Sequence, residues 1–123
     1  MSGSSFLLDT NVILYLLSGN KTIADILPDS HLYVSFISQL ELLGYKEITL
    51  KEQGLVKQFL QEVIIVDITE DIKNVTIDLK QRYSIKLPDA IIAATAIYLD
   101  IPLLTADKGF SKIEALNLAL YEE

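Results

Sequence analysis

The chain has 123 residues, 50% of them hydrophobic, which is enough for one domain with a buried core. It contains no cysteine, which excludes disulfides and thiolate metal sites, and its net charge of −7 argues against a broad basic surface for nucleic acid. The sequence has no apolar window of 18 residues and no pattern of a secretory signal. We therefore expect a cytoplasmic protein that does not enter a membrane.

Strands and helices are expected to alternate through the first half of the chain. Residues 1–5 are expected to form a flexible lead to a single domain that spans residues 1–123. In chain order we then expect a strand at 6–9, a helix from 10 or 11 to 17, a short helix near 22–27, a strand at 32–36, and helices at 38–47 and 49–61. Thr49 and Glu52 have capping-box spacing, which supports the start of the last of these helices.

The same alternation continues in the second half. The β-branched run at 63–66 predicts a third strand, buried on both faces. Helices are expected at 69–83 and 88–99, with Pro88 in a first helical turn. A strand at 103–105 follows, and 118–121 is expected to be a fifth strand at an edge. This order predicts an α/β fold, a three-layer α/β/α sandwich around a central parallel sheet of four to five strands.

Four acidic residues lie where a strand ends or a helix begins, namely Asp9, Glu41, Asp89 and Asp107. In a parallel sheet the carboxyl ends of the strands share one edge, and ligands bind there. We therefore expect these side chains to converge. Converging carboxylates repel one another, so they need protons or a cation to share a site. A cluster with only oxygen ligands suits Mg²⁺ or Mn²⁺.

Each acid alone also has an ordinary structural explanation. Asp9 suits a helix cap, Asp89 the first turn of a helix and Asp107 a turn. Glu41 is the least expected, since leucines flank it, although it also fits a surface face of its helix. The joint placement of all four favours a functional site. The polar side chains expected to hydrogen-bond the acids or a metal-bound water are Thr10, Asn11, Ser38 and Thr105.

The four acids and their polar neighbours belong to four short motifs. The motifs are Leu7-Leu8-Asp9-Thr10-Asn11, Ser35-x-x-Ser38-x-x-Glu41-Leu42, Leu87-Pro88-Asp89-Ala90-x-x-Ala93-x-x-Ala96 and Leu104-Thr105-Ala106-Asp107-x-x-Phe110. On these motifs the chain resembles PIN domains of the VapC-type toxin family. The resemblance covers nearly the whole chain, which is more acidic than is usual for the family and has few basic residues beside its last motif.

The resemblance implies a Mg²⁺- or Mn²⁺-dependent endoribonuclease that cleaves single-stranded or looped RNA. It further implies the toxin of a type II toxin–antitoxin pair, a homodimer silenced by an antitoxin protein whose tail blocks the acidic pocket. Carried over to this chain, the catalytic and metal-binding residues would be Asp9, Glu41, Asp89 and Asp107. The expected products carry a 5′-phosphate and a 3′-hydroxyl.

Several other residues have both a functional and a structural interpretation. Apolar side chains of the first helix, such as Ile13, Leu14 and Leu17, suit a dimer or antitoxin groove, and core packing explains them equally well. His31, the only histidine, is expected to be structural or exposed. Tyrosines 15, 45, 83 and 98 suit base stacking or packing. The candidate phosphate contacts are Lys46, Arg82, Lys86, Lys108 and Lys112.

Two alternatives from other classes stay open. A receiver domain of a signalling system has a similar length and alternation, and Asp67 would be its phosphoacceptor, with Thr105 and Lys108 as partners. Its first strand should then lead into a close acidic pair, whereas here only Asp9 is present. The other alternative is a catalytically inactive PIN scaffold that binds RNA or protein.

Overall fold

Five parallel strands form one sheet in the described part of the computed structural model, which covers residues 4–19 and 29–121. The strand order is β3-β2-β1-β4-β5. The strands are β1 (Ser5–Leu8), β2 (His31–Ser35), β3 (Ile64–Val66), β4 (Leu103–Thr105) and β5 (Leu118–Leu120). The helices are α1 (Thr10–Leu17), α3 (Phe36–Gly44), α4 (Leu50–Gln61), α5 (Glu70–Arg82), α6 (Leu87–Leu99) and the short 3₁₀ helix η1 (Lys108–Lys112).

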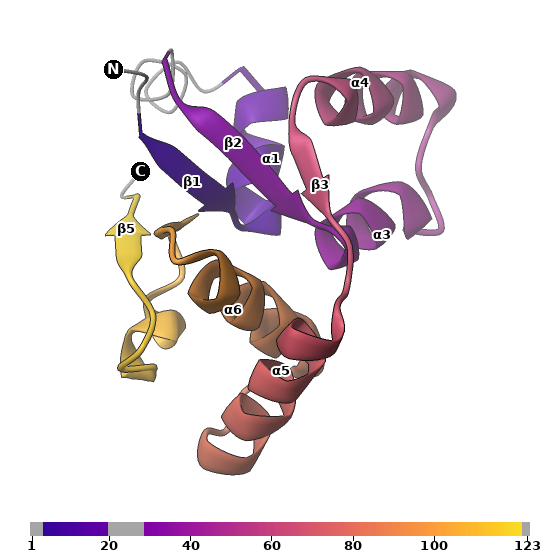
Figure 1. Ribbon diagram of the computed structural model, residues 1–123. Helices are drawn as coiled ribbons and strands as arrows, with labels where there is room; N and C mark the ends of the chain where they lie inside the picture. The colour runs from indigo at the N-terminus through magenta and orange to yellow at the C-terminus, as the bar shows by residue number, and fades with distance from the viewer. Residues whose placement is uncertain (1–3, 20–28, 122–123) are drawn as a thin grey trace.

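Helices cover both faces of the sheet (Figure 1). Successive residues of a strand point to opposite faces, so Leu7 and Leu8 of β1 enter two different cores. Leu7 packs in a core with residues of α5, α6 and η1, whereas Leu8 packs in a core with residues of α1, α3 and α4. The expected three-layer α/β/α sandwich with a parallel sheet is confirmed.

The register of the sheet brings the ends of three strands to one edge. Leu7 of β1 lies opposite Tyr33 of β2, and Leu8 lies opposite Leu104 of β4. The backbone N–H of Asp9 donates to the carbonyl of Leu104 over 3.0 Å, so the residues after β1 and β4 stay side by side. Helices α1 and α3 begin directly after β1 and β2. This edge is therefore where strand ends and helix starts meet.

The third strand is placed differently from the expectation. Its apolar run predicts burial on both faces, but Ile64 is 52% exposed and Ile65 is 36% exposed. The reason is that β3 is the last strand of the sheet and pairs only with β2. A β-branched run indicates a strand, but its neighbours decide how much of it is covered. The expected edge position of the fifth strand is confirmed, at Leu118–Leu120.

The helix ends follow from their caps. Thr49 and Glu52 form the expected capping box at the start of α4, and the Thr69 hydroxyl caps α5. Helix α3 begins two residues before its expected start, because the Ser35 hydroxyl accepts the backbone N–H of Ile37. The short helix expected near 22–27 lies outside the described residues. His31, at the start of β2, is exposed as expected.

Candidate active site

Asp9 is buried at the end of β1, with 5% of its surface exposed. Although it stands at the N-cap position of α1, its side chain makes no capping hydrogen bond to that helix. Instead, its Oδ2 accepts a 2.6 Å hydrogen bond from the hydroxyl of Thr105, at the end of β4. The Thr105 hydroxyl oxygen in turn accepts the backbone N–H of Asp107 over 3.0 Å. One fully buried threonine thus connects the two aspartates.

Glu41 is exposed on α3 and is held by the first residue of α1. The Thr10 hydroxyl donates to Glu41 Oε1 over 2.8 Å and lies 2.8 Å from the hydroxyl oxygen of Ser38. Because the single hydroxyl proton of Thr10 goes to Glu41, the buried Ser38 must be the donor to Thr10. The chain of hydrogen bonds therefore runs from Ser38 through Thr10 to the carboxylate. It fixes the start of α1 against α3 at the edge where Asp9 lies.

Asp89 and Asp107 belong to the elements on the other side of Asp9. Asp89 is half-buried in the first turn of α6, next to Pro88. Asp107 is exposed, and its Oδ1 accepts the backbone N–H of Gly109 over 2.8 Å, which caps η1. A Cβ atom at Gly109 would lie 3.0 Å from that same oxygen, so the glycine leaves space for the carboxylate. The ordinary turn role expected for Asp107 is thus present, and it also fixes the orientation of the side chain.

The electrostatics show that Asp9 and Asp89 each feel the negative charge of other carboxylates of this group. Burial raises the pKa of Asp9 most, the Thr105 hydrogen bond opposes that rise, and the charges of Asp89 and Asp107 add to it. The pKa of Asp89 is raised by partial burial, and then by the negative charges of Asp107 and Glu41. Four segments of the chain thus bring like charges to one edge, where a cation would relieve the repulsion.

The donor set fits a hard cation, since it consists of carboxylate and hydroxyl oxygens alone. Within residues 4–19 and 29–121, however, no three acidic or histidine side chains stand ready to hold one ion together. Mg²⁺ usually keeps several waters and takes only one or two carboxylates directly. The arrangement therefore suits an ion bound partly through water, with the remaining acids as its outer neighbours.

The structure separates the polar and basic candidates. Thr10, Ser38 and Thr105 all contact an acid or its hydrogen-bonded partner, whereas Asn11 lies exposed on α1.

Arg82 forms an ion pair with Asp78 on α5 over 3.1 Å. Among the lysines, Lys86 and Lys112 line a pocket of about 260 Å³ together with Asp89 and Asp107, and Lys46 and Lys108 are exposed. The sequence reasoning missed Ser84 and Gly109, which also line this pocket; the glycine two residues after Asp107 was the available signal.

An apolar groove lies between α1, α3 and α4. It measures about 230 Å³ and is lined mainly by Leu14, Leu17, Leu42, Tyr45 and Leu55. Leu14 is 45% exposed, so its side chain is available at the surface, whereas Ile13 is fully buried in the core. Of the three apolar residues proposed for a groove, two therefore line one and the third is a core residue.

Tyr15 packs against Tyr121, with ring centroids 5.8 Å apart. Tyr83 is half-buried against the core on the α5–α6 face of the sheet. For these two tyrosines the packing interpretation holds. Tyr98 is exposed on α6.

No helix among the described residues has both the length and the apolar character needed to cross a membrane.

Comparison with known proteins agrees with this architecture. The family model described as PIN domain matches residues 6–116. A chain in a toxin–antitoxin complex from Klebsiella pneumoniae is 31% identical and has a TM-score of 0.80, with 95% of this chain and 98% of that chain covered. A chain of VapBC-1 from nontypeable Haemophilus influenzae is 26% identical, with a TM-score of 0.75 and coverage of 94% and 97%.

A third solved structure shows the same fold at lower identity. It is VapBC2 from Rickettsia felis, bound to a DNA fragment from the promoter of VapBC2. One of its chains is 21% identical and has a TM-score of 0.82, with 96% of this chain and 99% of that chain covered. A search of curated protein sequences finds no match.

Asp67, the phosphoacceptor of the receiver alternative, follows the edge strand β3, which is separated from β1 by β2.

Proposed function

The chain belongs to the PIN domain family, and from that premise we propose that it is a divalent-metal-dependent endoribonuclease, the toxin of a type II toxin–antitoxin pair. The observation that carries the proposal is the gathering of acids from separate segments at one edge of the sheet. Burial raises the pKa of both Asp9 and Asp89 there, and the negative charges of neighbouring carboxylates add to that rise. A protein that only binds RNA has no need for such a charge concentration. Family membership also argues against the receiver alternative.

Asp9, Glu41, Asp89 and Asp107 are the residues proposed to hold the ion, which we take to be Mg²⁺ or Mn²⁺. When bound, the ion supplies Lewis acidity at the phosphate and a water of lowered pKa. Thr105 keeps one oxygen of Asp9 in a fixed direction, and Thr10 does the same for Glu41. This holds the acids in place before any substrate arrives.

The exposed acids are the ones that substrate and water can reach. We propose that Glu41 or Asp107 orients the attacking water and accepts its proton. Water, rather than the ribose 2′-hydroxyl, forms the new bond to phosphorus while the bond from phosphorus to the 3′-oxygen breaks. The leaving 3′-oxygen takes up a proton, so the products carry a 5′-phosphate and a 3′-hydroxyl. The substrate is single-stranded or looped RNA, in which the phosphate backbone can enter the acidic edge. Lys46, Arg82, Lys86 and Lys108 remain the proposed backbone contacts.

The partner is proposed to be an antitoxin protein that lays an apolar helix into the groove between α1, α3 and α4. Leu14 and Leu55, 45% and 44% exposed, offer the apolar surface such a helix needs. Neighbouring structures are toxin–antitoxin complexes, which supports a partner of this kind. We further propose a homodimer and a cytoplasmic location, where both RNA and antitoxin are present.

Cleavage of a panel of folded RNAs tests the enzyme directly. The wild type should cut with Mg²⁺ or Mn²⁺ and stop with EDTA, and Asp9→Asn should lose at least a hundredfold in rate while remaining folded. Asp67→Asn is the matched control, because it removes an exposed carboxylate at the end of the edge strand. Equal rates for the wild type and Asp9→Asn would remove Asp9 from the mechanism. RNA binding without any cutting would favour the inactive scaffold.

A further inference from the structure

The pocket beside the candidate acids carries two lysines as well as two carboxylates. Lys86 immediately precedes α6, and Lys112 ends η1, so the two ammonium groups come from different elements. Asp89 and Asp107 line the same pocket, which therefore adjoins the proposed metal site. A cavity that places two ammonium groups next to the proposed metal site suits a phosphate group of the substrate.

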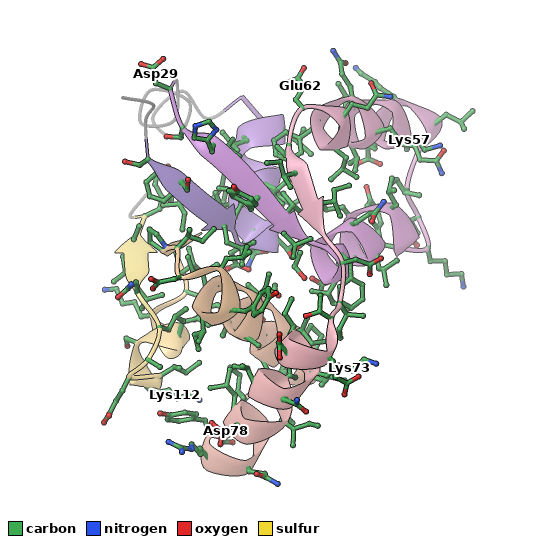
Figure 2. The ribbon with its side chains drawn as sticks, in the orientation of Figure 1. Asp29, Lys57, Glu62, Lys73, Asp78 and Lys112 are labelled. Carbon is green, nitrogen blue, oxygen red and sulfur yellow. The ribbon has the colours of Figure 1, made fainter. Side chains whose placement is uncertain are left out.

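Lys112 is fixed at the wall of this pocket. Its ammonium group donates a hydrogen bond to the backbone carbonyl of Ser84, in the segment between α5 and α6. Figure 2 shows the Lys112 side chain reaching from η1 toward the end of α5. An ammonium group has three N–H donors, so two remain for a ligand. A lysine already held in place loses less side-chain entropy when it binds a phosphate.

Lys86 lines the same pocket as Asp89. It stands at the N-cap position of α6, three residues before Asp89, so its ammonium group lies beside the acids. Arg82, only four residues earlier, is instead paired with Asp78 and lines a different hollow. Lys86 is thus the basic residue of this segment that faces the site.

The chain needs local cations at this place. With a net charge of −7 and four acids at one edge, an approaching polyanion is repelled before it reaches the metal site. The pocket also has apolar walls, formed by half-buried Ile85 and buried Phe110, against which a sugar or base can pack. Its volume of about 260 Å³ is small, which suits a single nucleotide rather than a longer stretch of chain.

We propose that this pocket binds the nucleotide adjacent to the scissile phosphate of single-stranded RNA, with Lys86 and Lys112 contacting its phosphate. The inference rests on the proposed ribonuclease function and adds to it a place where the strand is held. Both lysines are positioning residues, since they hold the flanking nucleotide and leave bond cleavage to the acids and the ion.

The experiment measures RNA binding without cleavage. A fluorescein-labelled single-stranded RNA is titrated with the Asp9→Asn protein in EDTA over a series of salt concentrations. The logarithm of the association constant falls linearly with the logarithm of the salt concentration. Adding Lys86→Gln or Lys112→Gln should each make this slope less steep by about 0.7, the value for one lost phosphate contact on a single strand. Lys57→Gln, on α4, is the matched control for charge and should leave the slope unchanged. Figure 2 shows Lys57 far from Lys112.

The Ser84 contact requires a second variant. Lys112→Arg keeps the charge and should keep the slope, which separates phosphate binding from local structure. In the metal-dependent assay, with Asp9 intact, both glutamine variants should raise KM by more than they lower kcat.

The proposal is overturned if both glutamine variants bind with the slope of the Lys57 control, or if Lys112→Arg loses as much slope as Lys112→Gln. Failure of the wild type to cut RNA would sink the proposed ribonuclease instead. The binding slopes, measured without metal, would still decide whether the pocket holds RNA.

Discussion

Replacing Thr105 with valine tests whether one hydroxyl holds the acidic edge together. The two side chains have nearly the same shape, and Thr105 is fully buried, so the change removes hydrogen bonds with little change in packing. The bond lost to the Asp9 carboxylate contributes about 1.5–3 kcal/mol, because its acceptor is charged. The bond lost from the Asp107 N–H contributes about 0.5–1.5 kcal/mol.

Together these losses predict that Thr105→Val lowers the free energy of unfolding by about 2–4.5 kcal/mol. For 123 residues the entropy of unfolding is about 0.26 kcal/mol/K, so the Tm should fall by roughly 8–17 °C. The measurement is thermal and urea unfolding at pH 7 without divalent ions. Thr105→Ser keeps the hydroxyl and loses one methyl group, so it should cost only about 0.5–1.5 kcal/mol.

The pH dependence gives an independent check. The Thr105 hydroxyl favours the charged form of Asp9, so its loss raises the pKa of Asp9 further. The destabilisation should therefore be largest at neutral pH and should shrink as the pH falls through the pKa of Asp9, where the carboxyl is protonated. If Thr105→Val unfolds within 0.5 kcal/mol of the wild type, or if the serine variant is the less stable of the two, the hydrogen bonds are not what holds this edge.

Three further predictions concern charge, metal and partner. Because the pKa of Asp9 is raised, the wild type loses stability as the pH rises through that pKa. Without divalent ions, Asp9→Asn should therefore have a higher Tm than the wild type at pH 7. The difference in Tm should disappear at acidic pH, where Asp9 is protonated. Adding Mg²⁺ at a hundredfold excess over Kd should stabilise the wild type by about 2.7 kcal/mol and the variant much less, as scanning calorimetry would show; equal gains would place the ion elsewhere. Leu14→Glu should put a charge into the apolar groove and weaken antitoxin binding by at least tenfold in calorimetric titration, whereas Lys57→Glu should not; unchanged affinity would move the partner to another surface.

The sequence predicts the fold and the acidic edge well, for clear physical reasons. Alternating apolar runs and capped helices such as Thr49–Glu52 are local signals, and parallel strands then place Asp9 and Asp107 at the same edge. The gathering of the acids is a consequence of topology. Which of them serves as ligand or base is a separate matter and remains a proposal.

Other features depend on contacts that no local pattern encodes. The exposure of Ile65 follows from the position of β3 in the sheet order, which the run of β-branched residues does not specify. The chain of hydrogen bonds from Ser38 to Glu41 passes through Thr10, which comes from a helix 28 positions away. The closeness of Lys112 to Ser84 likewise arises only when η1 folds back on the end of α5.

The contact between Asp9 and Thr105 spans 96 positions of sequence. Strand β1 lies between β2 and β4, so its second neighbour exists only after the ribosome has translated the codons that separate the two strands. Contacts this distant form late, after the intervening loop has closed. A nascent polypeptide that stops before Thr105 therefore carries Asp9 without its hydrogen-bond donor, and the acidic edge is assembled only after β4 has been made.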